Sequence, residues 1–121
     1  MTSPTLLRDL ADQVERLSAK DDADKALGLR RAISNAVLGL PRMYTPPWHR
    51  SFDAARSIST WIITHASDIA ADGMAMVELS DTGGPCRPVN IVRGIASTLP
   101  AALCAASLRA RAVEMEEDNG P

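Results

Sequence analysis

The chain has 121 residues, of which 45% are hydrophobic and 23% charged, and its formal net charge is -2. These values are typical of one globular domain and exclude an intrinsically disordered chain. The slightly negative charge argues against a general nucleic-acid binder, because phosphate contacts need many Lys and Arg side chains. Aromatic residues make up only 3%, so we expect an aliphatic core with modest stability or support from self-association.

Cysteine use and hydropathy predict a protein that stays in the cytoplasm. Cys86 and Cys104 have no metal-type spacing, and we interpret them as free thiols, with a disulfide as the less favoured alternative. No stretch approaches the about 18 apolar residues of a membrane span. Arg8 and Asp9 follow only two leucines, so the N-terminus lacks the apolar run of a signal peptide.

Helical periodicity predicts two amphipathic helices in the first third of the chain. Ser3 followed by Pro4 is typical of a helix start, and apolar residues recur at helical spacing over 4–18. A second helix is expected to start within the charged turn 20–25 and to end at about residue 40. The two helices are expected to pack as an antiparallel pair.

An irregular segment follows over 41–50, where Pro46 and Pro47 exclude a continuous helix. Ser51 is a good cap for a short helix over 51–59. The residues expected to face the core from this helix are Phe52, Ala55 and Ile58.

Three strands are predicted next, at Thr60–Thr64, Met74–Ser80 and 88–95. The first stretch is also compatible with an extension of the preceding helix over 60–66. In the second strand, Ala75, Val77 and Leu79 share one face. In the third, Val89, Ile91, Arg93 and Ile95 alternate with Asn90 and Val92. The segments expected to form turns between the strands are 68–73 and 81–85.

The last helix is expected to start at Ser97 or Thr98 and to follow an alanine-rich stripe as far as Val113. The acidic end over 114–121 is expected to fray. The predicted fold is a single α+β domain over 1–121, in the order α-α-short α-β-β-β-α. Its simplest architecture is a three-stranded antiparallel meander sheet packed with three to four helices.

Three stretches of the chain resemble one recurring pattern in small phage proteins. Tyr44-Thr45, then residues 51–55 with the sequence Ser-Phe-Asp-Ala-Ala, then Trp61 are similar to a Tyr-Thr, a Ser-Leu-Asp-Ala-Ala and a Trp in those proteins. The opening segment 3–15 and the alanine-rich segment 97–112 are similar to their first and closing helices. Together these segments resemble the phage ABA-sandwich domain family.

The resemblance implies this fold and a phage or prophage origin, and it implies no catalytic residues. The chain departs from the family pattern in two places. An insert over 46–50 separates the Tyr-Thr from the Ser-Phe-Asp-Ala-Ala run, and the distance from that run to Trp61 is shorter than usual. We interpret Trp61 itself as a core residue.

The sequence carries no catalytic motif: it lacks a phosphate loop, a dinucleotide fingerprint, a nucleophile elbow and a paired-histidine metal motif. His49 and His65 are the only imidazoles, and we interpret both as surface or capping residues. Asp68 and Asp72 lie near His65, but turn formation accounts for both. We therefore predict no enzyme, no metal and no cofactor.

The best candidate site is the cluster Arg42, Tyr44, Trp48, His49 and Arg50. Guanidinium groups bind phosphate and aromatic rings stack on bases, a combination typical of nucleotide or single-stranded nucleic-acid binding. The same residue types are enriched at protein interaction hot spots. The structural alternative is that Tyr44 and Trp48 cover the edge of the core while the arginines are solvated.

The leading functional hypothesis is a small non-catalytic phage or prophage accessory protein that binds a host protein, for example as an inhibitor of host defence. One alternative is a protein that binds or sequesters a nucleotide through the 42–50 segment. Another, less favoured because of the net charge, is a nucleic-acid-binding protein. A membrane partner is not expected, and a homodimer is compatible with the composition.

Overall fold

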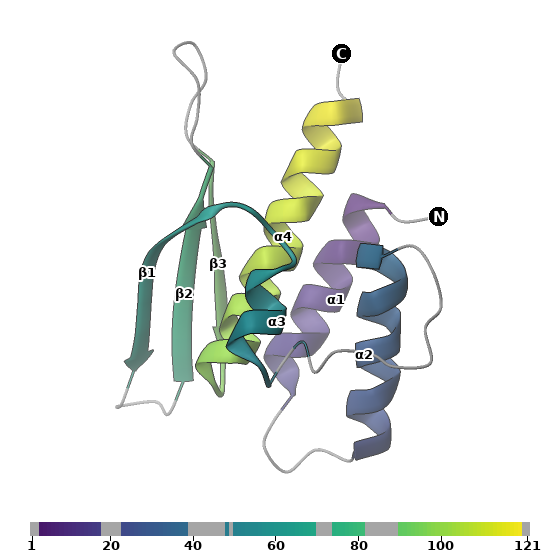
Figure 1. Cartoon of the computed structure of the whole chain (residues 1–121), viewed down its shortest axis with the longest axis vertical. Helices are drawn as coiled ribbons and strands as arrows, with labels where there is room; N and C mark the ends of the chain where they lie inside the picture. The colour runs from purple at the N-terminus through teal and green to yellow at the C-terminus, as the bar shows by residue number, and fades with distance from the viewer. Residues whose placement is uncertain are drawn as a thin grey trace.

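In the residues that it describes, a computed structural model shows four helices and one three-stranded sheet (Figure 1). It describes residues 3–17, 23–38, 48, 50–69, 74–81 and 90–119. The predicted α+β fold and its order of elements are confirmed. The elements are α1 (Pro4–Arg16), α2 (Ala23–Leu38), α3 (Phe52–Arg56), β1 (Ile62–Ile69), β2 (Met74–Ser80), β3 (Ile91–Ala96) and α4 (Leu99–Asn119).

The serine and threonine residues predicted to start helices do so through their side chains. The hydroxyl oxygen of Ser3 accepts a hydrogen bond from the Leu6 N–H at 3.1 Å, with Pro4 in the first helical position. Ser51 caps α3 through the Ala54 N–H at 3.2 Å, and Thr98 caps α4 through the Ala101 N–H at 3.3 Å. Each bond satisfies a backbone donor that has no partner within the helix.

The three strands form an antiparallel meander in the order β1-β2-β3, as predicted. Strand β1 has a bulge between Ile63 and His65, where the pairing with β2 shifts register. The Thr64 hydroxyl lies in this bulge and donates to the backbone oxygen of Glu78 at 3.2 Å. The bulge places Thr64 and His65 together opposite Glu78.

Several predicted boundaries and orientations were wrong. Strand β1 starts at Ile62 and continues to Ile69, so Asp68 pairs with Ala75 instead of starting a turn. His65 accordingly lies within the strand. Phe52, predicted to face the core, is 40% exposed, because the short helix α3 packs against the core through Ala55 and Ala54.

Helix α4 is the centre of the molecule and packs against the sheet, α1 and α3 (Figure 1). All residues from Ala101 to Leu108 are buried. A helix that is apolar around its whole circumference belongs in an interior, and small side chains let neighbouring backbones approach it closely. Gly94 of β3 lies at the closest approach: a Cβ there would overlap the carbonyl oxygen of Ala102 and lie 2.7 Å from the Ala106 nitrogen.

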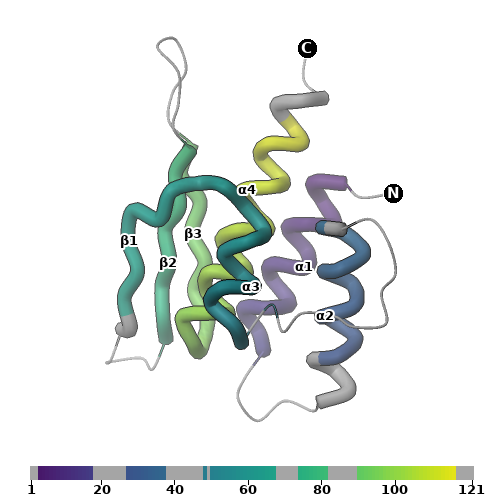
Figure 2. Tube along the Cα trace, viewed as in Figure 1, coloured from purple at the N-terminus to yellow at the C-terminus, as the bar shows by residue number. Residues whose placement is uncertain are grey.

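Helices α1 and α2 lie on the other side of α4 from the sheet (Figure 2), and α1 also contacts the edge strand β3. Leu7, Leu10, Ala11 and Val14 are the buried side chains of α1, and Leu29 and Ile33 of α2 are also in the core. None of the helices in the described ranges combines the length and hydrophobicity needed to cross a membrane.

Candidate binding surfaces

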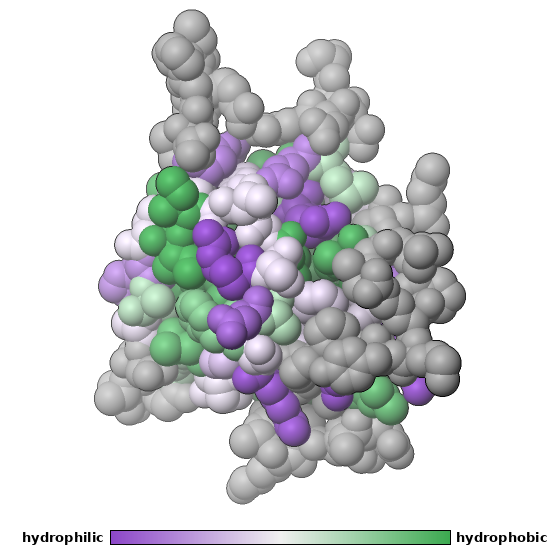
Figure 3. All heavy atoms as spheres, in the orientation of Figure 1, coloured by the Kyte–Doolittle hydropathy of each residue, from purple (hydrophilic) through white to green (hydrophobic). Residues whose placement is uncertain are grey.

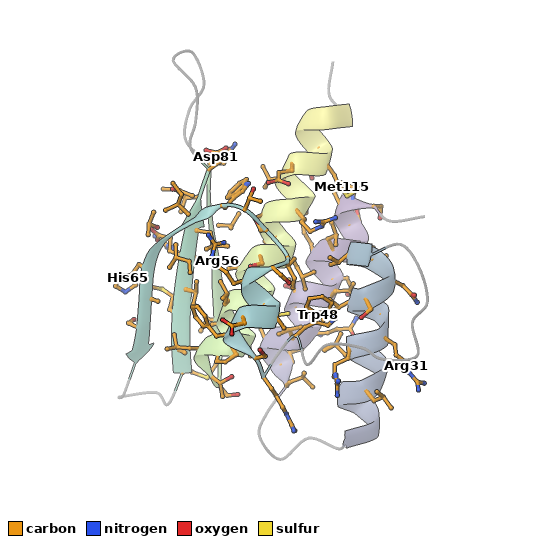
Figure 4. The ribbon with its side chains drawn as sticks, in the orientation of Figure 1. Arg31, Trp48, Arg56, His65, Asp81 and Met115 are labelled. Atoms are coloured by element: carbon orange, nitrogen blue, oxygen red, sulfur yellow. The ribbon has the colours of Figure 1, made fainter. Side chains whose placement is uncertain are left out.

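The predicted cluster over 42–50 does not form a site in the described part of the chain. Arg42, Tyr44 and His49 lie outside the described residues, and Arg50 is exposed. Trp48 is only 3% exposed and lies among the helices (Figure 4). Its indole Nε1–H donates to the buried Ser34 hydroxyl of α2 at 2.9 Å. The indole therefore has no free face on which a base could stack, and it forms part of the core.

In the described part of the chain, the groups that could act in catalysis, His65 and Cys104, lie in separate surroundings. His65 points away from the body of the molecule, and its Nε2 lies 3.1 Å from the Ser67 hydroxyl oxygen (Figure 4). Cys104 is fully buried in α4, and this burial raises the pKa of its thiol, so it is not a thiolate near neutral pH. Among the described residues, no three His, Cys, Asp or Glu side chains are grouped to hold a metal ion.

Arg109 of α4 joins three elements through charged hydrogen bonds. Its guanidinium donates to both carboxylate oxygens of Glu15, at 2.6 and 2.7 Å, and to Asp12 at 2.7 Å. The hydrogen bond to Glu15 is the main cause that raises the pKa of Arg109, and the bond to Asp12 acts in the same direction. A further bond at 2.7 Å reaches the carbonyl oxygen of Arg93, and Glu15 accepts the Ile95 N–H at 2.7 Å. Two polar groups on the free edge of β3 are thus occupied by α1 and α4.

The acidic end of the chain does not begin to unwind at Glu114, because α4 continues to Asn119. Glu114 accepts the indole Nε1–H of Trp61 at 2.5 Å, and Trp61 is 5% exposed, as expected of a core residue. Glu116 forms an ion pair with Arg8 of α1. These two carboxylates attach the last turns of α4 to the body of the molecule.

A groove of about 510 Å³ lies between α1 and α2. Its apolar part is formed by Leu6, Leu10, Leu17, Leu29 and Ala32, next to Gly28. Leu6 is 39% exposed, and a Cβ added at Gly28 would meet no atom within 4 Å. Asp9, Gln13 and Arg16 supply the polar side chains of the groove, and the Gln13 amide donates to Asp9 at 2.8 Å.

The outer face of the sheet is the second apolar surface, and it is the face that α4 does not cover. Apolar atoms gather on the side of the molecule that carries β1 and β2 (Figure 3). Ile62 is 49% exposed, Ile91 56% and Ile95 43%. In the middle of this face, Arg93 Nε donates to Glu78 at 2.8 Å.

Sequence reasoning missed both surfaces. The alternation of Ile91, Arg93 and Ile95 was visible, but a period of two does not say which face of a strand is covered. No local sequence pattern indicated the groove, because residues of two different helices form it. The chain matches no family model, and comparison with curated proteins and with solved structures found no match.

Proposed function

We propose that this chain is a small non-catalytic binding protein whose α1–α2 groove receives an amphipathic helix of another protein. The observation that carries the proposal is the groove itself, with leucines along its floor and polar side chains beside them. Grooves of this kind bind helices that present apolar anchors at positions i, i+3, i+4 and i+7. The 13 residues of α1 span about 20 Å, which accommodates three to four turns of a partner helix.

The charges beside the groove specify the orientation of that helix. Asp9 and Arg16 are seven residues apart, which places them about 10 Å apart along α1. A partner helix with Lys or Arg opposite Asp9 and with Asp or Glu opposite Arg16 would be complementary to both. The reversed helix would bring like charges together.

The resemblance to the phage ABA-sandwich domain family supplies the biological setting of the proposal. On this proposal, the chain is a phage or prophage accessory protein and its partner is a protein of the bacterial host. Inhibition of a host defence protein is one role that such an interaction would serve. The resemblance rests on the quoted motifs alone.

The alternative of nucleotide binding is less well supported. Trp48 is buried and does not offer a ring on which a base could stack. A hollow of about 350 Å³ is lined by Arg8, Arg93 and Arg109, but it does not provide a free phosphate site. Each of these three guanidinium groups is already paired with a carboxylate, respectively of Glu116, Glu78 and Glu15. A phosphate would have to displace those carboxylates.

The test is a pull-down from a bacterial lysate with the wild-type chain and two matched variants. Leu6→Glu places a charge in the groove, whereas Phe52→Glu changes an equally exposed apolar residue of α3 outside it. We expect a stoichiometric partner protein with wild type and Phe52→Glu and its loss with Leu6→Glu. A partner retained by Leu6→Glu contradicts the groove. A co-purifying nucleotide that is lost on Arg50→Ala would favour the alternative.

A further inference from the structure

We propose that the outer face of the sheet is a two-fold dimer interface, and that its occupant is a second copy of this chain. The proposal concerns a surface on the opposite side of the molecule from the α1–α2 groove. A test of this proposal is therefore independent of the helix-binding function.

The strand register arranges this face into rows across the sheet. One row holds Ile62, Ser80 and Ile91, and a second holds Ser67, Met76 and Ile95, with Ile69 paired with Met74 beyond it. The middle row, between these two, contains His65 of β1, Glu78 of β2 and Arg93 of β3, and Glu78 and Arg93 form an ion pair. The face thus has one positive and one negative charge at its centre and apolar side chains on both sides of them.

This pattern is complementary to itself. A two-fold axis parallel to the strands and midway between β2 and β3 places β2 of one copy over β3 of the other. Glu78 of each copy then lies over Arg93 of its partner, and Met76 lies over Ile95. The same rotation brings Ser80 over Ile91. A two-fold interface needs such a self-complementary patch, because both copies contribute the same surface.

The charges of the middle row are compatible with this arrangement. Hydrogen bonding to Arg93 is the main cause that lowers the pKa of Glu78, and the nearby His65 acts in the same direction. Glu78 is therefore ionised near neutral pH. Two such dipoles stacked antiparallel form four alternating charges, and this order distinguishes a second copy from a purely apolar partner.

Closure of the β3 edge disfavours edge-to-edge pairing through β3, whereas β1 is the other edge strand of the sheet. Glu15 accepts the Ile95 N–H, and Arg109 donates to the Arg93 carbonyl, so these groups cannot pair with another strand. Strand edges blocked in this way prevent sheet extension. The apolar face remains as the surface through which two sheets can pack, about 10 Å apart.

The face is small, so the dimer is expected to be in equilibrium with its monomer. A standard interface buries about 800 Å² per partner, and the two strands that this axis superposes, β2 and β3, supply less than that. We expect the dimer fraction to rise from minor to dominant between about 1 and 500 µM, the behaviour of a weak interface. Sedimentation velocity over this concentration range measures it.

The decisive test exchanges the central charges. Glu78→Arg gives a face with two positive charges, and Arg93→Glu gives a face with two negative charges. Each variant alone is expected to stay monomeric, because like charges meet across the two-fold axis. An equimolar mixture is expected to restore the dimer, because positions 78 and 93 of one variant then face opposite charges on the other. The double variant Glu78→Arg with Arg93→Glu keeps both the ion pair and self-complementarity, and it is expected to dimerise alone.

Restoration by mixing excludes misfolding as the cause of the loss, and circular dichroism of each variant provides an independent check. Leu6→Glu, in the groove, is expected to leave the dimer unchanged, which separates this proposal from the proposed function. Three results would overturn the proposal: a wild-type chain that is monomeric throughout, single variants that dimerise like wild type, or folded variants whose mixture stays monomeric.

Discussion

Arg109 of α4 and Glu15 of α1, which lie 94 positions apart in the sequence, form a bidentate ion pair with N–O distances of 2.6 and 2.7 Å. Each side chain is 23% exposed, and Glu15 also accepts the Ile95 N–H of the edge strand. One pair therefore connects α4 and α1 and blocks the edge of β3. Bidentate pairs of this kind are stronger than single hydrogen bonds.

Replacing Arg109 by Met should destabilise the protein. The substitution keeps much of the apolar stem but leaves Glu15 without its counter-ion, for which we expect a loss of about 1–3 kcal/mol in the free energy of unfolding. Urea denaturation measures the change. Arg8→Ala is the matched control: its ion pair with Glu116 is 44% and 48% exposed, so its cost should be under about 1 kcal/mol. Equal costs would contradict the role given to Arg109.

Two glycine-to-alanine substitutions should have opposite effects on stability. At Gly94 the added Cβ overlaps the backbone of α4 at Ala102 and forces the sheet away from the helix, at a cost of about 3 kcal/mol. At Gly28, on an exposed part of α2, the added Cβ meets nothing, so better helix propensity should stabilise by about 0.5–1 kcal/mol. Thermal unfolding of both variants tests the pair, and a tolerated Gly94→Ala would contradict the close contact.

Trp48→Ala should unfold or strongly destabilise the chain. The side chain is 3% exposed, and its removal leaves a cavity and an unpaired Ser34 hydroxyl, for which we expect a loss of about 3–5 kcal/mol. Arg50→Ala, at an exposed position two residues later, should change stability by less than about 0.5 kcal/mol. Chemical denaturation followed by circular dichroism measures both. If the Trp48→Ala protein were as stable as wild type, Trp48 would not be a core residue and would again be a candidate binding residue.

The thiol of Cys104 should be inaccessible to reagents in the folded protein. In a Cys86→Ser background, a thiol-specific reagent should label the protein only after addition of denaturant, because Cys104 is fully buried. Rapid stoichiometric labelling in native buffer would contradict this burial.

Burial of Cys104 also predicts a loss of stability at alkaline pH. The pKa of this thiol is raised above its ordinary value of 9.0, so only the unfolded chain ionises it near that pH. Its contribution to stability is complete below the unfolded pKa and decreases as pH rises beyond it. Between about pH 8 and pH 10, the Cys86→Ser protein should lose more stability than the same protein carrying Cys104→Ala. Equal losses would indicate that the thiol titrates alike in both states.

The secondary structure was largely predictable because its signals are local. Ser3 with Pro4, Ser51 and Thr98 started helices as expected, since capping depends on bonds to residues three positions away. The end of β1 was not predictable in this way. Asp68 is a common turn residue, but pairing with Ala75 of β2 keeps it in the strand. The candidate residue Trp48 was assigned to a binding cluster because its partner, Ser34, lies in another element.

The sequence by itself determined which residues belong together on a helix stripe or a strand face, because periods of 3.6 and two are properties of the backbone. Only the tertiary structure decided which of those faces is covered. In β3 the isoleucines face outward and Gly94 faces α4, because the alanine-rich helix approaches the sheet too closely for any larger residue there. The α1–α2 groove and the Glu78–Arg93 face likewise arise from packing between distant segments, and no local pattern encodes such contacts.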